Sequence, residues 1–537
     1  MTNIEIPLER NRDRVYRFFE MLPGLLSWFT LSLPILLSLI SPTLAAYFII
    51  AYLLIWFIKM LVMNMRVVQG HRVLNQNMSY DWPKLLGELD NPKRAFEHYE
   101  QGVAPDWHRH NLIANHLRPA DRLRLKDVYH VIMIAHSIEG VEVVEPTIKT
   151  VLASHYDMKK VILLLCYEER CEPLAEEVAT SLTDKYKHRF YHMEAIKHPA
   201  HIPDEMIGKG ANITYAGHRA KQILEEKNIP FGSAIVTTLD ADNRPHPQYF
   251  AAVTYAYIAC PDPLHTSFQP ITIYTNNIWD ASAPMRVIAT GNSFWNIVLA
   301  LRPHMLRNFS AHSQSMQTLV DTDFWSVRTV VEDGHQFWRT YFRYDGRHDV
   351  LPIMIPVYLD AVLAKTYPKT IKAQFKQVRR WAWGASDIAF VLQKGWRDKN
   401  RVPKVDLFFK TMRLIDSHVS WATAPLLLLL GGFVPLYIAP HSRLSIVANQ
   451  LPVMASRIQL VAMIGLFISI YMSIRLLPPK PLRYKTRHRI YMVIQWVYMP
   501  FTTIIFNSFA ALNSQTRLIF GWYLGKFDIT EKAVKKY

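Results

Sequence analysis

SAIVTTLDAD, at residues 233–242, predicts a buried strand that ends in two carboxylates. Ala234, Ile235 and Val236 form an apolar run of the kind found inside a sheet. Asp240 and Asp242 follow, where the chain opens into a loop. Side chains two residues apart on an extended chain point the same way. Both carboxylates would therefore face one point at the carboxyl edge of a sheet, where α/β sheets bind ligands.

Two carboxylates at one point predict a site for a hard divalent cation. Mg²⁺ and Mn²⁺ prefer oxygen ligands of this kind, and such an ion can hold the diphosphate of a nucleotide sugar. The plain alternative is a polar loop with two solvated aspartates.

The bulk composition indicates a soluble domain joined to membrane segments. The chain has 537 residues, of which 50% are hydrophobic and 20% charged, with a net charge of +17. A basic collar on the cytoplasmic side of a membrane explains that charge as well as nucleic acid would, and no motif indicates a nucleic-acid partner. The three cysteines show neither a disulfide framework nor metal-ligand spacing, which fits a reducing compartment.

Two apolar stretches near the start predict a transmembrane hairpin. Residues 22–40 and 43–58 are each about one bilayer crossing long, and Ser41-Pro42 predicts the turn between them. Basic residues lie before the hairpin and after it, so both of its ends are expected in the cytoplasm. The flanking basic residues are Arg10, Arg12, Arg14, Arg17, Lys59, Arg66 and Arg72.

The second half of the chain predicts further membrane segments. Residues 394–418 are basic and amphipathic and predict a helix lying at the membrane surface. Residues 421–439 and 458–474 predict a third and a fourth span. Residues 490–512 are apolar but contain Pro500 and Asn507, so we expect a broken or interfacial segment there, with a fifth crossing as the alternative. The loop after residue 474 is strongly basic and is expected inside.

Between these regions the pattern alternates strand and helix. Strands are predicted at 128–137, 159–169, 190–196 and 233–242, with helices at 145–155, 172–187 and 207–227. This alternation predicts a doubly wound, mainly parallel sheet. The expected organisation is a transmembrane hairpin (1–65), a cytosolic lead-in (66–127), an α/β domain (128–393), an interfacial helix (394–418) and a C-terminal transmembrane region with a cytosolic tail (419–537).

Two further motifs suggest chemistry. Glu332 and Asp333, in VVEDGHQFWR at 330–339, could include a base that deprotonates a hydroxyl group. Alternatively, the two acids could favour the start of a helix. In QVRRW at 377–381, arginine suits a diphosphate and tryptophan offers a flat face for a sugar ring. The alternative for this motif is a basic helix anchored at the membrane surface.

In this order and spacing, and flanked by membrane segments, these motifs resemble the membrane-bound family 2 glycosyltransferases. That group includes the cellulose, chitin and hyaluronan synthases and ceramide glucosyltransferase. The resemblance covers residues 128–383, and FDITEK at 527–532 is similar to an ending common in the group. It implies a cytosolic α/β domain of the GT-A fold, with helical transmembrane segments on both sides of it in the sequence.

The resemblance also implies roles for individual residues. The metal ligands for Mg²⁺ or Mn²⁺ would be Asp240 and Asp242, the catalytic base Asp333 and its companion Glu332. Contacts to the nucleotide sugar would come from Glu139, Glu168, Lys209, Asn212 and Asp240. The diphosphate and the acceptor would be contacted by Gln377, Arg380, Trp381 and Gln269. Two positions depart from the family: SIE at 137–139 keeps only Glu139, and Glu168-Glu169 replaces an aspartate.

The implied activity is the inverting transfer of a sugar from a UDP- or GDP-linked donor to a lipid or a growing glycan. It would take place at the inner face of the membrane, with the protein in the plasma membrane and its catalytic domain in the cytoplasm. A metal-dependent membrane hydrolase could also use Asp240 and Asp242, and a catalytically inactive scaffold is a further alternative. The motifs leave open the sugar, the acceptor and the choice between processive and single transfer.

Overall fold

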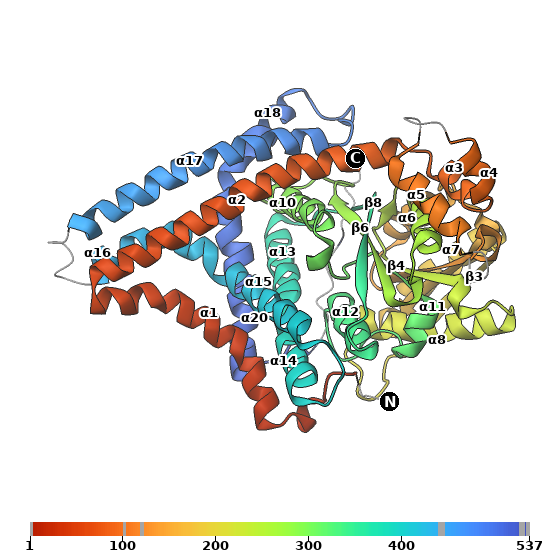
Figure 1. Ribbon diagram of the computed structural model, residues 1–537, viewed down its shortest axis with the longest axis horizontal. Helices are drawn as coiled ribbons and strands as arrows, with labels where there is room; N and C mark the ends of the chain where they lie inside the picture. Colours follow the sequence, from red (N-terminus) through yellow and green to blue (C-terminus); the bar gives the residue numbers. More distant parts are fainter. Residues whose placement is uncertain (1–3, 100–103, 119–122, 439–445, 526–531, 533–537) are drawn as a thin grey trace.

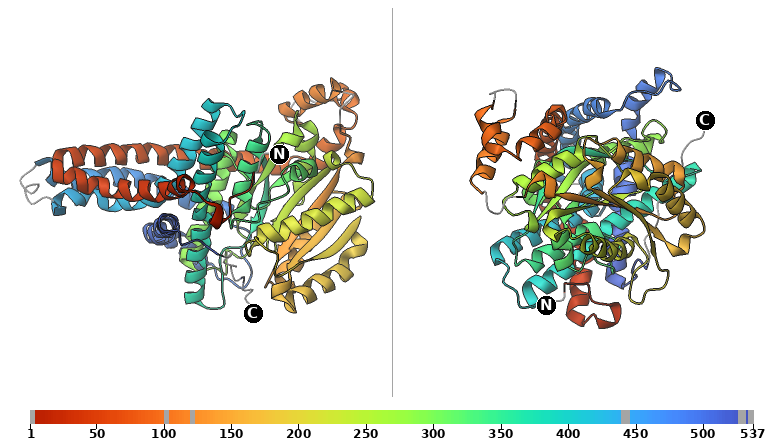
Figure 2. Two further views of the ribbon diagram at one scale, coloured as in Figure 1. Left: turned by 90° about the horizontal axis from the view of Figure 1, so that it is seen from below. Right: turned by 90° about the vertical axis from the view of Figure 1, so that its right-hand side faces the viewer.

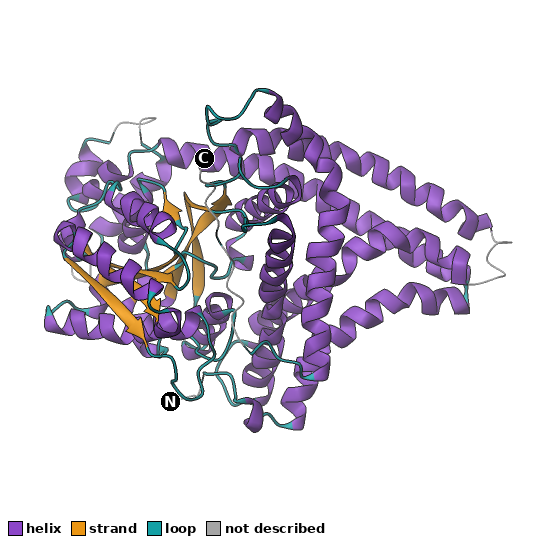
Figure 3. Ribbon diagram, turned by 180° about the vertical axis from the view of Figure 1, so that it is seen from behind, coloured by secondary structure: helices purple, strands orange, loops and turns teal. Residues whose placement is uncertain are grey.

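The computed structural model describes residues 4–99, 104–118, 123–438, 446–525 and 532. An α/β domain lies at one end of the molecule, and long helices project from it toward the other end (Figure 1). The strands gather inside the α/β domain with helices around them (Figure 3).

The sheet has eight strands in the order β3-β2-β1-β4-β7-β6-β8-β5. The first four in this order are parallel, as the alternating pattern predicted. β7 is antiparallel to β4 and β6, β8 is parallel to β6, and β5 is antiparallel to β8. The sheet is therefore mixed but mainly parallel. The strands are β1 Tyr129–His136, β2 Val161–Glu168, β3 His192–His198, β4 Ala234–Asp240, β5 Arg244–Pro245, β6 Thr266–Tyr274, β7 Ser313–Ser315 and β8 Asp349–Leu359.

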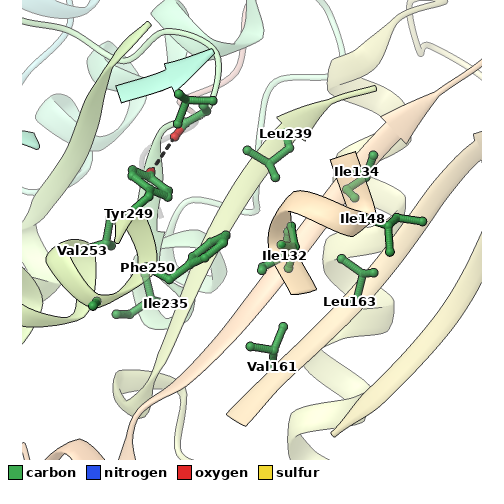
Figure 4. Packing of buried hydrophobic residues seen from close by; sticks show 14 of the residues in the cluster. Ile132, Ile134, Ile148, Val161, Leu163, Ile235, Leu239, Tyr249, Phe250 and Val253 are labelled. Atoms are coloured by element: carbon green, nitrogen blue, oxygen red, sulfur yellow. Dashed lines mark hydrogen bonds between the residues drawn. The ribbon is translucent and has the colours of Figure 1, made fainter. Parts of the chain in front are cut away.

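Helices cover both faces of the sheet, which explains why its central strands are apolar throughout. Ile132 and Ile134 of β1 pack on the face covered by α6, α7 and α9. Val131 and Met133 pack on the opposite face, under α8 and α11. These helices are α6 Val141–Leu152, α7 Leu174–Tyr186, α8 Lys209–Glu226, α9 Tyr249–Ala259 and α11 Met316–Asp321. Figure 4 shows the first face, with Ile132 and Ile134 near Ile148 of α6 and Phe250 of α9.

The remaining helices of the α/β end of the molecule frame this core. α3 Trp82–Glu88 and α5 Asp106–His116 of the lead-in contact α9 through Trp82 and Trp107, which meet Tyr255, and α4 Pro92–Glu97 contacts α5. α10 Ala283–Ala300 follows β6, and α12 Glu332–Arg343 begins at the two acids of the second motif. α13 Tyr367–Ala382 carries QVRRW and leads to α14 Asp387–Leu392.

Within the described residues, five helices are long and apolar enough to cross a membrane: Arg14–Ile40, Pro42–Ser79, Lys404–Ile438, Asn449–Leu476 and Arg487–Phe520. The expected hairpin is formed by α1 Arg14–Ile40 and α2 Pro42–Ser79, with Ser41 extended between them and Pro42 in the first turn of α2. α2 continues past residue 65, so the expected boundary between hairpin and lead-in falls inside a helix. No proline or glycine stands at 59–69 to end it.

The separation of residues 394–418 from a span at 421–439 is wrong. One helix, α15 Lys404–Leu430, runs through both, followed by a 3₁₀ turn at Gly431–Phe433 and by α16 Val434–Ile438. The helix starts only at residue 404 because Pro403 stands at its N-cap. Residues 393–397 form a π-helical turn instead. The amphipathic and apolar parts are thus two halves of the same rod.

Residues 490–512 are helical throughout, so the chain is not broken there, but the helix is irregular. It begins with α18 Arg487–Ile494, and a 3₁₀ turn follows at Gln495–Tyr498. A π-helical stretch at Thr503–Ser508 precedes the last part, α20 Phe509–Phe520. Pro500 and Asn507 lie in or beside these irregular turns. α20 runs steeply across α2 and α17 Ile446–Leu476 rather than alongside them (Figures 1 and 2). Whether this irregular helix crosses the membrane stays a prediction.

The arrangement of the projecting helices allows a prediction of which residues are accessible from outside the cell. α16 and the turn between α1 and α2 lie at the end of the molecule farthest from the sheet (Figure 1). If the α/β domain is cytoplasmic, a cysteine placed at Tyr437, which is 80% exposed, will react with an impermeant thiol reagent on intact cells. A cysteine placed at the exposed Gln76, near the domain end of α2, will react only after lysis. The reverse labelling pattern would refute the orientation. Ser442, at the same expected outer loop, lies outside the described residues.

Candidate functional site

The carboxyl ends of the parallel strands bring the first acidic motif to the expected edge of the sheet. Asp240 closes β4. Its two oxygens accept hydrogen bonds from Lys209 Nζ at 2.6 Å and from Ser310 Oγ at 2.7 Å. Burial disfavours the ionised carboxyl, but the ammonium groups of Lys209 and Lys532 outweigh this and hold the pKa of Asp240 below its ordinary value. Asp240 is therefore an anion held between cations.

Asp242 has a cationic partner from a distant part of the chain. Its Oδ1 accepts from Lys532 Nζ at 2.7 Å, and its Oδ2 accepts from the backbone N–H of Asp360 at 3.1 Å. Lys532 Nζ also lies 4.0 Å from Glu139 Oε1, and the backbone of Lys532 forms an isolated β-bridge with Leu363. It is the final residue of FDITEK, whose other residues lie outside the described part. The sequence singled out this motif without placing its lysine at the carboxylates.

The donor set of the two aspartates is compatible with a divalent cation that is shared with a ligand. Mg²⁺ is commonly held by one or two carboxylates together with phosphate oxygens of the substrate. Among the described residues, no group of three or more His, Cys, Asp or Glu side chains could hold a metal by itself. An ion at Asp240 and Asp242 would therefore depend on oxygen atoms from the ligand. It would also have to share these carboxylates with Lys209 and Lys532.

Lys209 links the first acidic pair to the second. It stands at the start of α8; its charge helps to lower the pKa of Asp240 and opposes the rise that burial causes in the pKa of Glu332 and Asp333. The next residue, Gly210, allows α8 to approach α12 closely. A Cβ atom there would lie 2.5 Å from the Ser326 carbonyl oxygen and 3.0 Å from Glu332 Cβ. Gly210 of GKGAN thus serves a close contact between two helix starts.

Glu332 and Asp333 occupy the first turn of α12, as the helix-start alternative also predicted. Glu332 is 2% exposed, and burial together with the charge of Asp333 raises its pKa to about 7. Burial also raises the pKa of Asp333, although Lys209 and Arg380 oppose the shift. Asp333 Oδ1 accepts from the Gly334 N–H at 2.7 Å, and its side chain remains partly exposed. Of the two acids, Asp333 is the one that a ligand can reach.

QVRRW reaches the same site from α13. The charge of Arg380 acts on Glu332, Asp333 and Tyr274, and the Trp381 ring centroid lies 6.4 Å from that of Tyr274. Burial raises the pKa of Tyr274, at the end of β6, and the negative charges of Asp240 and Asp242 raise it further. Gln377 accepts from Gln374 Nε2 at 3.3 Å, so its bonded partner lies on its own helix.

Several expected ligand contacts are engaged in holding the protein together. Asn212 Nδ2 donates to the Cys166 carbonyl oxygen at 3.1 Å. Glu139 accepts from the backbone N–H of Ser137 at 2.8 Å. Gln269 is 3% exposed and binds the backbone at Phe309 and Ser310. We therefore assign Gln269 a positioning role, because Ser310 is the residue that donates to Asp240.

Sequence reasoning missed Ser310, Lys532, Asp360 and Tyr274. Burial and the charge of Asp242 raise the pKa of Asp360 to about 7. Ser310 and Asp360 carry no local signal, since the first lies in a loop and the second follows a strand that was not predicted. Tyr274 lies five residues after Gln269, which the resemblance did single out.

Comparisons with known proteins yield distant structural likenesses only. No family model and no curated protein sequence matches the chain. A mannosyltransferase from Pyrobaculum calidifontis, solved with GDP-Man and Mn²⁺, is 12% identical with a TM-score of 0.41, covering 77% of this chain and 99% of its own. S. aureus TarS 1–349 is 10% identical with a TM-score of 0.34, covering 74% and 93%. These likenesses are too distant to assign a function, which has to come from the site.

Glu168, an expected contact of the nucleotide, forms an ionic cluster instead. Its Oε2 lies 3.0 Å from His198 Nδ1 and 2.7 Å from Arg170, and His198 Nε2 lies 3.0 Å from Glu205. Burial disfavours the charged imidazolium, but the two carboxylates outweigh it and raise the pKa of His198 to about 9. The cluster fixes the end of β3 against the end of β2.

The raised pKa of His198 predicts a pH-dependent contribution to stability. Because an unfolded histidine titrates near about 6.5, this contribution is complete below that pH and is lost as the pH rises through about 9. In detergent, His198→Gln should lower the melting temperature clearly at pH 6 and much less at pH 9.5. The exposed His188→Gln is the matched control. An equal loss at both pH values would show that His198 contributes packing alone.

Proposed function

We propose that this chain is a membrane glycosyltransferase that moves a sugar from a nucleoside diphosphate sugar to a membrane-associated acceptor, with inversion at the anomeric carbon. One observation carries the proposal. At the carboxyl edge of the sheet, Lys209 binds Asp240 and its charge acts on Glu332 and Asp333, while Lys532 binds Asp242, so two acidic pairs and two lysines meet in one place. Ligands bind at this edge in α/β sheets. The family resemblance of the motifs and the apolar helices are consistent with it.

The cationic side of the site suits a diphosphate leaving group. Lys209 and Lys532 contact the two aspartates, and the charge of Arg380 reaches the acids of α12. These groups can neutralise the charge that develops as the bond between sugar and diphosphate breaks. A bound Mg²⁺ or Mn²⁺, held by Asp240 and Asp242, would supply further neutralisation. UDP- and GDP-linked donors both fit this chemistry.

The acidic side supplies the base. Asp333 is partly exposed, while Glu332 is buried beside it with a pKa near 7. Below neutral pH, where Glu332 is mostly protonated, Asp333 can therefore carry the negative charge of the pair. Asp333 takes the proton of an acceptor hydroxyl, which attacks the anomeric carbon from the side opposite the leaving diphosphate. A single displacement of this kind inverts the configuration.

The acceptor is proposed to be a lipid or a glycan that grows at the inner face of the membrane. The α13 helix that carries QVRRW packs against the candidate span Arg487–Phe520, where Ser514 Oγ of α20 donates a hydrogen bond to the Arg379 carbonyl oxygen. Gln377 and Trp381 would then line the acceptor side. The sugar, and single or processive transfer, remain to be determined by assay with a panel of nucleotide sugars.

Two other functions are less well supported. A metal-dependent membrane hydrolase could use Asp240 and Asp242 but has no use for a second acid pair together with Arg380. An inactive scaffold needs none of these charges in one place, and assembling them costs free energy because burying charged groups is unfavourable. Both alternatives predict no sugar transfer with any donor.

The base assignment predicts a contrast between two conservative variants. Asp333→Asn removes proton acceptance but keeps the volume of the side chain. Turnover should fall by about 10²–10⁴, the usual weight of general-base catalysis. Glu332→Gln imitates the protonated acid and should keep turnover within a few-fold at pH 6. Donor binding, measured by titration of the nucleotide sugar, should change little in either variant.

Comparing the two variants also distinguishes a catalytic role of Asp333 from a purely structural one. If Asp333 only starts the helix, asparagine replaces it at a cost of at most about 1 kcal/mol of stability, and turnover stays near that of the wild type. That result, with a folded protein, would move the base to Glu332. A large loss in both variants would indicate that the pair acts as a unit.

The metal assignment predicts loss of activity in excess chelator and recovery on addition of Mg²⁺ or Mn²⁺. Asp242→Asn should abolish turnover while expression and melting temperature stay close to those of the wild type. Full turnover in chelator would refute the metal requirement. In that case Lys209 and Lys532 would be the groups that neutralise the diphosphate, and Lys532→Met would lower turnover strongly.

A further inference from the structure

A cavity of about 310 Å³ lies between the lead-in helices, α9 and the first residues of β8. Its size is at the lower end for small-molecule sites. The side chains used below are Asn77, Trp82, Trp107, Asn111, Tyr255 and Ala259, all of which line the cavity. Other lining residues include Leu351 to Met354 of β8, whereas Asp360 follows the far end of that strand. Six residues of extended chain span about 20 Å, so the cavity is separate from the carboxylate site.

Aromatic rings form one wall. Trp82 and Trp107 are stacked, with centroids 5.5 Å apart and ring planes at 23°. Tyr255 meets both rings edge-on, at 5.5 Å from each. Trp82 Nε1 donates to the backbone carbonyl oxygen of Asn77 at 2.8 Å, and this hydrogen bond fixes the orientation of the indole ring. Flat, rigid rings offer a large contact area at little cost in side-chain entropy.

Hydrogen bonds behind this wall hold Tyr255 in place. Its hydroxyl group lies 2.8 Å from His108 Nδ1 and accepts from Asn111 Nδ2 at 3.1 Å. His108 Nε2 lies 2.7 Å from Glu88. With the imidazole proton on Nε2, the hydroxyl donates to His108, and His108 donates to Glu88. The wall is therefore organised before any ligand arrives.

Two polar side chains of the cavity, Asn77 and Asn111, have amide oxygens that can accept hydrogen bonds. Asn77 Nδ2 donates to the Val73 carbonyl oxygen at 2.8 Å, and Asn111 Nδ2 donates to Tyr255. Neither amide oxygen accepts a hydrogen bond from another residue of the described part of the chain. None of the side chains that line the cavity, within that same part, carries a charge.

From this chemistry we infer that the cavity binds a neutral saccharide, separately from the proposed catalytic site. The C–H face of a sugar ring can lie on the aromatic wall, and its hydroxyl groups can donate to the two amide oxygens. A nucleotide or a uronic acid would bring negative charge to a wall with no cation. A purely apolar ligand would cover the amide oxygens without a hydrogen bond, which is unfavourable. The inference stands on the cavity alone and does not require the transferase activity.

The test is calorimetric titration of the full chain in nanodiscs with neutral trisaccharides of glucose, N-acetylglucosamine or mannose. UDP and GDP are present in excess, so that binding at the carboxylate site is suppressed. At least one neutral trisaccharide should bind, and the trisaccharide of galacturonic acid should bind at least about tenfold more weakly. No binding of any neutral trisaccharide to the folded protein, or equal binding of the acidic one, would overturn the inference.

Variants locate the binding. Trp107→Ala removes an aromatic face, Asn111→Leu removes an acceptor at similar volume, and Ala259→Leu fills part of the cavity while all three aromatic side chains are kept. Each should weaken binding by about tenfold or more. Trp396→Ala, at an exposed tryptophan elsewhere, is the matched control and should bind like the wild type. Asp242→Asn should also bind like the wild type. Binding that is lost in Asp242→Asn but kept in Ala259→Leu would place the saccharide at the carboxylates and overturn the inference.

Discussion

The ion pair between Lys209 and Asp240 is the contact on which the site depends. It joins the start of α8 to the end of β4, and the same ammonium group acts on both acids of α12. Four carboxyl groups in one place would repel each other, and burial makes the repulsion stronger. Lys209, Lys532 and Arg380 make this arrangement possible. The close approach of α8 to α12 at Gly210 brings the lysine within reach.

The sequence predicted the parallel half of the sheet, and it placed one acidic pair at a strand end and the other before a helix, because each depends on local pattern. Four apolar strands with helical patterns between them leave few alternative topologies. Asp240 could be placed because it ends β4, whereas Asp242 lies in the turn that follows the strand. The sequence did not predict β7, which is three residues long, or β8, whose two prolines obscure the strand pattern.

The side-chain partners in the site could not be predicted, since they depend on contacts between remote segments. Gln269 was expected at the acceptor, but its buried amide supports the backbone that carries Ser310. Glu168 was expected at a nucleotide, but His198 and Arg170 engage it. The division at residue 418 failed for a different reason. Amphipathic and apolar stretches follow each other on one continuous helix, and composition alone cannot tell this from two helices.

The contact between Lys532 and Asp242 joins residues 290 positions apart. All five apolar helices and the whole sheet precede Lys532 in the chain. A ribosome therefore releases Asp242 long before it makes the lysine that neutralises it. During that interval the α/β domain can fold, but its acidic centre lacks one of its cations. The charge balance of the site is completed only after the five apolar helices have been made, which ties the maturation of the site to completion of these helices.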